Sequence, residues 1–301
     1  MTIIPVESEA HWHAIRLKHI GGSESAALMG CAEDYQQSPY ALFQVKSGRI
    51  PAPVVEGQRI EAGKRLEGAI AEWIAFGEGW KVEQFKGYAE CDSEPRMGCT
   101  PDFVILNHPE GPAGLQIKNV DWLVHKRKWT NGEPPMSVLI QVQHEMHCTG
   151  HKISYVGALV GGNEPVTYRV DYRPKIGAEI EKRVRAFWES VKAGVEPPVD
   201  GTDSTAAALA AMFPEATLGL EIDLTTDNEF SVRWADFRQA RMDRQAAEKA
   251  EQSNKNWIMA RIGEAEIIKS GGMVIGTCKT QSRKAFEVKA STSRVLRTKD
   301  V

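Results

Sequence analysis

The sequence predicts a mixed α/β fold in which a central mixed sheet carries helices on both sides. Two observations lead to this prediction. Short apolar runs bounded by Gly, Pro, Asn or Asp are typical of strands, and they occur at residues 80–89, 103–106, 115–118, 155–160 and 166–170. Longer segments with apolar residues at helical spacing lie between and around these runs, and the strongest are 61–78, 137–148 and 174–192.

The composition is that of an ordinary globular protein. The chain has 301 residues, of which 42% are hydrophobic and 26% charged, so it is long enough for a core domain plus a smaller appendage. No apolar run approaches the ~18 residues of a membrane helix and no basic-then-apolar signal begins the chain, so we expect a cytoplasmic protein with no membrane partner. The five cysteines form no C-x-x-C pair, which argues against a zinc ribbon or iron–sulfur cluster and favours reduced, buried thiols.

Three short helices are expected near the start of the chain, over 8–19, from Ser23 to Gly30, and over 38–48. Ser23 follows a Gly-Gly turn and can cap the second helix. The N–H groups at that helix start, the Ser23 hydroxyl and the nearby Arg16 form a candidate phosphate cradle. The alternative is an ordinary capped helix. In the following helix, Glu67 is either a solvated carboxylate or a side chain that points at the site described next.

A β-hairpin is predicted within residues 97–118, and it carries the candidate chemistry. Asp102 begins the first apolar run, and a turn rich in Asn, Pro and Gly separates it from the second run. Alternation in the second strand places Gln116 and Lys118 on one face and apolar residues on the other. Oxygen ligands for Mg²⁺ beside a cation are what metal-assisted phosphodiester hydrolysis needs. By itself, the pattern also fits a surface hairpin with a solvated lysine.

Two further segments follow the hairpin. A basic run, Lys126-Arg127-Lys128, is bracketed by Trp122 and Trp129, a combination that suits a nucleic-acid backbone and its exposed bases. The alternative is a solvated helix face with buried tryptophans. The predicted helix 137–148 then places Gln141, His144, Glu145 and Cys148 on one face. His144 and His147 are three residues apart, so a zinc-binding pair is conceivable, but the segment lacks the H-E-x-x-H spacing of zinc proteases.

A Pro- and Asp-rich break at 196–205 predicts a domain boundary near residue 200, with domains at 1–200 and 201–301. Beyond it we expect a short helix near 206–213, a strand near 218–224 and a long polar helix over 226–262. A basic β-hairpin is expected from 272–280 and 284–289. Residues 269–301 carry eight basic and two acidic side chains, which is compatible with phosphate contact or with a solvated hairpin.

Several motifs occur in an order that resembles the lambda-exonuclease-like (YqaJ-type viral recombinase) family of PD-(D/E)xK nucleases. The resemblance covers roughly residues 10–195. It rests on Arg16 with Gly22-Ser23-Glu24, Gly63 to Glu67, Met97 to Asp102, Leu115 to Lys118, and Gln141 to His144. It implies a restriction-endonuclease-like core, to which this chain adds the C-terminal helical arm and basic hairpin.

The resemblance also implies roles for individual residues. Asp102 would be the principal Mg²⁺ ligand, completed by Gln116 and Glu67, and Mn²⁺ would substitute for Mg²⁺. Lys118 would act on the attacking water and the developing phosphate charge, with Gln141 beside it. Arg16 and Ser23 would hold a 5′-terminal phosphate. The DNA-contact candidates are Lys126, Arg127, Lys128 and Trp129.

The implied activity is 5′→3′ digestion of linear double-stranded DNA ends in phage-type recombination, leaving a 3′ single-stranded overhang. A ring-shaped homotrimer and a single-strand annealing protein as partner are also implied. One departure stands out, because the family usually has an acid where this chain has Gln116. Gln116 is either natural variation or an inactivating change. Two other functions remain open, a PD-(D/E)xK endonuclease and a catalytically silent DNA-binding or annealing module.

Overall fold

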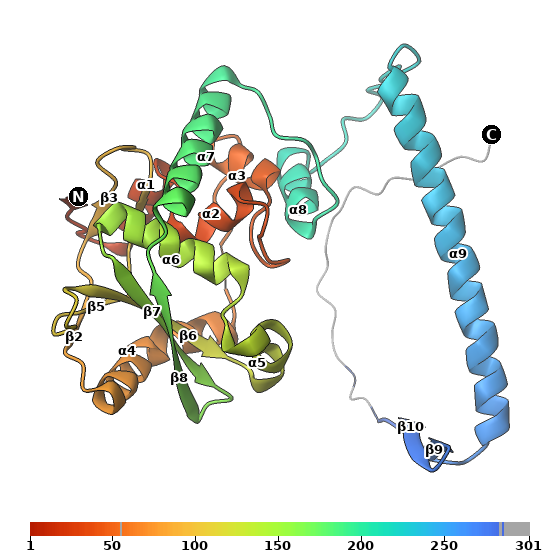
Figure 1. Ribbon diagram of the computed structural model, residues 1–301. Helices are drawn as coiled ribbons and strands as arrows, with labels where there is room; N and C mark the ends of the chain where they lie inside the picture. Colours follow the sequence, from red (N-terminus) through yellow and green to blue (C-terminus); the bar gives the residue numbers. More distant parts are fainter. Residues whose placement is uncertain (55, 283–284, 286–301) are drawn as a thin grey trace. The chain divides into compact units, whose positions relative to one another are not determined.

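The computed structural model describes residues 1–54, 56–282 and 285, and it divides into two compact units, Met1–Pro214 and Glu215–Val301 (Figure 1). The division lies beyond the boundary expected near residue 200. Helix α8 (Asp203–Met212) belongs to the first unit, where its Ala208 packs with Tyr40 and Ala41 of helix α3 (Pro39–Lys46).

A five-stranded sheet forms the centre of the first unit, in the order β2-β5-β6-β7-β8. Its strands are β2 (Val82–Gln84), β5 (Phe103–Ile105), β6 (Ala113–Val120), β7 (Ile153–Val160) and β8 (Glu164–Asp171). Only β6 and β7 pair in parallel, and the other neighbours are antiparallel. The sheet is therefore mixed, and the predicted hairpin is its β5–β6 pair.

Helices α4 (Gln58–Glu78) and α6 (Met136–Thr149) cover opposite faces of this sheet (Figure 1). Leu115 and Ile117 of β6 pack with α4, as the predicted alternation requires. On the other face, Val156 and Ala158 of β7 pack with α6. The buried sheet therefore has an apolar core on each side, and the polar side chains of β6 point toward α6.

A second core lies beside the sheet, where α6 also contacts a small sheet in the order β1-β3-β4. Its strands are β1 (Thr2–Ile4), β3 (Tyr88–Glu90) and β4 (Gly98–Cys99). Helices α2 (Gly22–Leu28), α3 and α7 (Pro174–Ala193) contribute side chains to it, as does Ile20, which follows α1 (Glu9–Leu17). Strand β4 ends three residues before Asp102, so this core holds in place the segment that leads into the hairpin.

Two expected strands differ in the structure. Residues 80–89 form not one strand but two, β2 and β3, which belong to different sheets. Residues 218–224 form no strand, and Leu218, Leu220 and Ile222 are exposed. Their alternating apolar pattern has no described neighbouring strand that could pair with it.

The second unit contains the expected long helix, α9 (Asn228–Ile262), which begins after the cap residue Asp227. A hairpin follows, formed by β9 (Ile267–Ser270) and β10 (Met273–Thr277). Gly271 and Gly272 connect the strands at φ of 56° and 82°, angles that favour glycine. The first strand of the predicted hairpin is present as β10, which pairs with the preceding β9. Its expected partner, 284–289, lies outside the described residues except for Ala285.

Within the described ranges, no helix combines the length and apolarity that spanning a membrane requires. All five cysteines are free thiols. Cys91, Cys99 and Cys148 are buried as expected, whereas Cys31 and Cys278 are only half-buried.

Candidate active site

Asp102 lies at the start of β5, directly beside the second strand of the hairpin. The register pairs Phe103 with Leu115, so Asp102 comes opposite Gln116. Asp102 Oδ2 accepts hydrogen bonds from Gln116 Nε2 at 2.5 Å and from the Ile117 backbone N–H at 2.7 Å. The hairpin therefore holds the carboxylate in one orientation.

Gln116 presents an oxygen atom that lacks a partner. The side chain is 4% exposed, and its Oε1 accepts no hydrogen bond from the part of the chain that the structure describes. A buried polar atom without a partner is costly, so such atoms mark places where a ligand or ion completes the structure. Here the oxygen lies next to the Asp102 carboxylate.

Lys118 connects the hairpin to helix α6. Its Nζ donates a hydrogen bond to Gln141 Oε1 at 3.2 Å, and Gln141 Nε2 donates in turn to Glu145 Oε1 at 2.9 Å. Gln141 and Glu145 are one helical turn apart and share a face of α6. The chain of contacts brings a third carboxylate, that of Glu145, to the site.

Glu67 on α4 also reaches the site. Burial and the negative charge of Asp102 raise the pKa of Glu67 to about 7, while Lys118 opposes the shift. Burial and Asp102 raise the pKa of the buried Glu145 to about 8. Burial also raises the pKa of Asp102. The positive charge of Lys118 and the hydrogen bonds that Asp102 accepts from Ile117 and Gln116 offset part of this rise. Three carboxyl groups therefore lie near a single cation, Lys118, and its charge does not prevent the rise of their pKa values.

The donors fit a hard divalent cation such as Mg²⁺. Mg²⁺ prefers carboxylate and carbonyl-type oxygens, and the site offers Asp102, Glu67, Glu145 and the partnerless Gln116 Oε1. A cation bound there would stabilise the ionised carboxylates against the burial and the mutual repulsion that raise their pKa values. The structure thus brings together all five residues that the sequence marked as catalytic, Glu67, Asp102, Gln116, Lys118 and Gln141.

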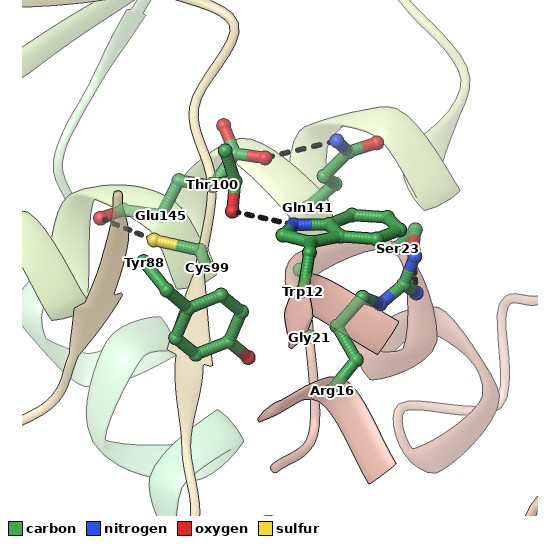
Figure 2. Close-up of a pocket in the computed structure, with 10 residues that line it drawn as sticks. Trp12, Arg16, Gly21, Ser23, Tyr88, Cys99, Thr100, Gln141 and Glu145 are labelled. Atoms are coloured by element: carbon green, nitrogen blue, oxygen red, sulfur yellow. Dashed lines mark hydrogen bonds between the residues drawn. The ribbon is translucent and has the colours of Figure 1, made fainter. Parts of the chain in front are cut away.

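Arg16 and Ser23 lie in an adjoining cavity of about 170 Å³ (Figure 2). The Arg16 Nη2 atom is 3.5 Å from Ser23 Oγ, and its guanidinium lies over the Trp12 ring at 4.6 Å. The cavity is lined by Trp12, Arg16, Gly21, Gly22, Ser23, Tyr88, Cys99, Thr100, Gln141 and Glu145. Because Gln141 and Glu145 line it, the cavity and the carboxylate site are neighbours.

An ion pair between Glu24 and Lys46 lies beside this cavity and contacts two of the residues that line it, Arg16 and Gly21. Glu24 contacts Lys46 Nζ with both oxygens, at 3.0 and 2.9 Å, and accepts the Gly21 N–H at 2.8 Å. Burial would raise the pKa of Glu24, but Lys46 and Arg16 together lower it below its ordinary value. Arg16 is therefore held by an ionised carboxylate, with its Nη2 3.5 Å from Glu24 Oε1.

Some residues of the site were not singled out from the sequence. Glu145 had a detectable signal, since it lies four residues after Gln141 on the predicted helix face. Trp12 and Tyr88 had none, because nothing in their spacing relates them to Ser23. The Tyr88 hydroxyl is buried and has no partner among the described residues, and burial raises its pKa strongly, so it remains a neutral donor.

The basic segment forms helix α5 (Trp122–Lys128), on which Lys126, Arg127 and Lys128 are exposed. Lys128 pairs with Glu33. Trp129 was wrongly expected to contact DNA: it is 7% exposed and packs in the core beside Val138 and Val142. Of the two tryptophans that bracket the basic run, Trp122 is the exposed one, at 52%. The Lys126 ammonium lies over its ring, 5.1 Å from the centroid.

Comparison with known proteins shows what this chain is similar to. Residues 11–152 match the model of the YqaJ-like viral recombinase domain. The YqaJ protein of Bacillus subtilis (strain 168) is 26% identical over 239 residues, which cover 73% of this chain and 68% of that protein.

Solved structures show the same fold. An alkaline exonuclease from Laribacter hongkongensis, LHK-Exo, superposes with a TM-score of 0.52 at 20% identity, and its complex with dAMP does so at 0.52 and 21%. Both matches cover 62% of this chain and 94% of LHK-Exo. Residues 11–152 are thus similar to the YqaJ-like viral recombinase domain, and the fold around them is that of the alkaline exonuclease.

Proposed function

We propose that this protein is a Mg²⁺-dependent exodeoxyribonuclease that digests linear double-stranded DNA from its 5′ ends and leaves a 3′ single-stranded overhang for recombination. The observation that carries the proposal is the buried Asp102 carboxylate. It accepts a hydrogen bond from Gln116 Nε2, while Gln116 Oε1 has no partner among the described residues, and it lies near Lys118 and two further carboxyl groups. The recombinase family and the exonuclease fold support a nuclease role.

Asp102, Gln116 and Glu67 would hold the metal, with Glu145 at the same site. When bound, Mg²⁺ supplies Lewis acidity toward the phosphate and the attacking water. Asp102 would be kept in place by the Ile117 N–H, so that its charge is oriented before the substrate arrives. Mn²⁺ prefers the same oxygen ligands and would substitute.

Lys118 would position the attacking water and stabilise the negative charge that develops on the phosphate. Gln141 accepts a hydrogen bond from Lys118 and donates one to Glu145, so it fixes the direction of the ammonium group. These contacts come from β6 and α6, two rigid elements that pack on one another. The lysine would therefore need little reorganisation during the reaction.

Arg16 and Ser23 would bind the terminal 5′-phosphate in the adjoining cavity. The Tyr88 hydroxyl, which has no described partner, is a further donor for phosphate oxygens in that cavity. A 5′-phosphate held there would place the scissile bond next to the carboxylates, because Gln141 and Glu145 line both sites. This arrangement would select 5′→3′ polarity. Lys126, Arg127 and Lys128 on the exposed face of α5 would contact the DNA backbone.

The family resemblance adds two proposals on assembly, a homotrimer that encircles the DNA and a single-strand annealing protein as partner. Neither is needed for the chemistry at Asp102. Light scattering coupled to size exclusion tests the first, and a mass of one chain at working concentration would refute it. Co-purification with an annealing protein encoded beside this chain tests the second.

The decisive experiment compares linear duplex labelled at its 5′ or its 3′ ends with a closed circular duplex of the same sequence. We expect Mg²⁺-dependent release of 5′ label as mononucleotides, slow loss of 3′ label, and an intact circle. Cleavage of the circle would instead indicate an endonuclease. DNA binding without any Mg²⁺-dependent digestion would indicate a silent binding or annealing module.

Gln116→Glu completes the test. Robust digestion by the natural sequence would show that Gln116 is an active variant of the site. The added carboxylate should lower the Mg²⁺ concentration that gives half-maximal activity, because it places another charge beside Asp102. Activity that appears only in Gln116→Glu would show that the natural glutamine inactivates the site.

A further inference from the structure

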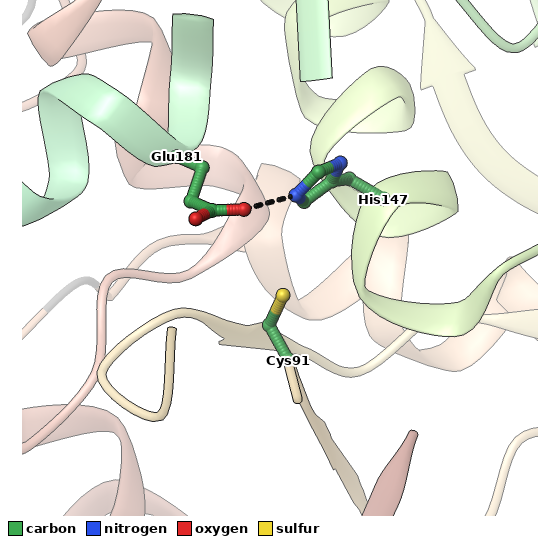
Figure 3. Close-up of side chains that lie close together, drawn as sticks. All are labelled: Cys91, His147 and Glu181. Carbon is green, nitrogen blue, oxygen red and sulfur yellow. Dashed lines mark hydrogen bonds and ion pairs between the residues drawn. The ribbon is translucent and has the colours of Figure 1, made fainter. Parts of the chain in front are cut away.

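A second cluster of metal-ligating side chains lies apart from the carboxylates of the proposed active site. It consists of Cys91 after β3, His147 near the end of α6, and Glu181 on α7. The Cys91 sulfur, a His147 ring nitrogen and a Glu181 oxygen all lie within 4.8 Å of one another. In Figure 3 the Cys91 sulfur points toward the gap between the other two side chains.

The three groups are held in the orientations that coordination needs. His147 Nε2 is 2.8 Å from Glu181 Oε2, and its Nδ1 is 2.6 Å from the Tyr172 hydroxyl. Ser93 Oγ donates to the same Glu181 oxygen at 2.7 Å and lies 3.2 Å from Cys91 Sγ. Metal-binding histidines commonly use their second nitrogen for such an oriented contact, and metal-binding carboxylates are likewise hydrogen-bonded.

The three groups differ in exposure and in their present partners. Cys91 is buried, whereas His147 and Glu181 are half-buried. Glu181 Oε1 pairs with Arg185 Nη2 at 2.6 Å, and Glu181 Oε2 is the oxygen that contacts His147. A metal ion held by the three groups would replace the contact between His147 Nε2 and Glu181 Oε2, and its binding would release protons, because such ligands bind as thiolate and neutral imidazole.

We propose that Cys91, His147 and Glu181 bind a zinc ion, with water in the fourth position. The ligand atoms of a tetrahedral zinc stand about 3.5 Å apart, so small side-chain movements close the site. Thiolate and imidazole ligands favour Zn²⁺ over Mg²⁺, whereas the active site offers oxygen alone. The ion would tie the segment after β3 to α6 and α7, and this site does not depend on the proposed nuclease activity.

The histidine pair suggested by the sequence does not form this site. His144 contacts Ser25 Oγ and the Gly98 carbonyl oxygen, and it is completely buried. Burial lowers the pKa of His144 to about 4, so it is a neutral core residue. His147, almost one helical turn further along α6, reaches the cysteine and glutamate instead.

Metal analysis of the purified full-length chain tests the proposal. We expect about one zinc per chain by inductively coupled plasma mass spectrometry. Cobalt(II) added to the chelator-treated, reduced protein should produce thiolate-to-cobalt charge-transfer absorption and the visible bands of tetrahedral cobalt. A folded wild-type chain that retains no zinc and gives no such absorption would overturn the proposal, and would show that the cluster is an ion-pair network.

Variants locate the bound ion. Cys91→Ser should lose the charge-transfer absorption, and His147→Gln should lower the zinc content at least fivefold, with circular dichroism confirming the fold. Cys31→Ser, a half-buried cysteine outside the cluster, is the matched control and should keep both signals. Asp102→Asn should also keep both. Loss of the cobalt spectrum in Asp102→Asn but not in Cys91→Ser would place the ion at the active site and refute the proposal.

Discussion

Helix α6 serves two clusters that differ in the chemistry of their donors. Gln141 and Glu145 face an active site built only from oxygen ligands and a lysine. His147, two residues after Glu145 and on another face, lies close to the Cys91 sulfur and a Glu181 carboxylate oxygen. If both proposals hold, one rigid helix presents a hard oxygen site to Mg²⁺ and a softer sulfur- and nitrogen-containing site to zinc. Changes at the first should alter cleavage, and changes at the second should alter metal content.

The largest effect is expected for Asp102→Asn. Loss of the charge that faces Gln116, Glu67 and Lys118 should lower the rate of DNA digestion by roughly 10³-fold or more, while DNA binding persists. Initial rates on linear duplex at saturating Mg²⁺ measure this, and a gel-shift assay measures binding. Asp34→Asn, at an exposed position, is the control. Retained digestion by Asp102→Asn would contradict the proposed site.

Lys118→Met should lower the turnover rate by about 10²-fold, because the ammonium group held by Gln141 would no longer act on the water or phosphate. Single-turnover rates on linear duplex separate this loss from weaker DNA binding. The exposed Lys152→Met should match the natural protein. If Lys118→Met changes only the DNA dissociation constant, the lysine is a binding residue.

Arg16→Ala should reduce the preference for 5′-phosphorylated over 5′-hydroxyl ends by about tenfold, since one charge-assisted contact to the phosphate is lost. Initial rates on the two substrates give the ratio. Arg59→Ala, an exposed arginine at the start of α4, should leave the ratio unchanged. A preference that survives in Arg16→Ala would place the 5′-phosphate elsewhere.

The smallest effect concerns stability and pH. The pKa of Glu145 is about 8 in the folded chain, against 4.5 for an ordinary glutamate. Between these values the folded state retains a proton that the unfolded state releases, so the unfolding free energy of the metal-free protein falls as pH rises from 5 to 9. Glu145→Gln should flatten this decline, by several degrees in Tm at pH 8.

Thermal unfolding at a series of pH values checks this prediction. Glu83→Gln, on the exposed face of β2, should retain the natural pH dependence. Saturating Mg²⁺ should also flatten the decline, because the cation takes the place of the proton. Zinc content should not change in Glu145→Gln, so the two clusters on α6 can be separated. An unchanged pH dependence in Glu145→Gln would show that its carboxyl is not the titrating group.

Local patterns predicted the fold where each element contains its own signal. The hairpin of Asp102 and Lys118 and the α6 segment followed from alternation, helical spacing and turn residues. Alternation of apolar and polar residues also predicted a strand at 218–224, which the structure does not contain. A strand needs a neighbouring strand to pair with, and alternation within one segment does not show whether such a neighbour exists. For Trp129, composition could not distinguish an exposed aromatic from a buried one.

The sequence alone determined the order of motifs, the family resemblance and the face of β6 that carries Gln116 and Lys118, since these depend on residues close together in the chain. Only the tertiary structure decided that Glu145 joins the site, that Glu24 and Lys46 support Arg16, and that Cys91 meets His147 and Glu181. The physical reason is that these contacts join residues from distant segments. Spacing in the sequence does not encode the burial that raises the pKa of Glu145 or the neighbouring cations that lower the pKa of Glu24.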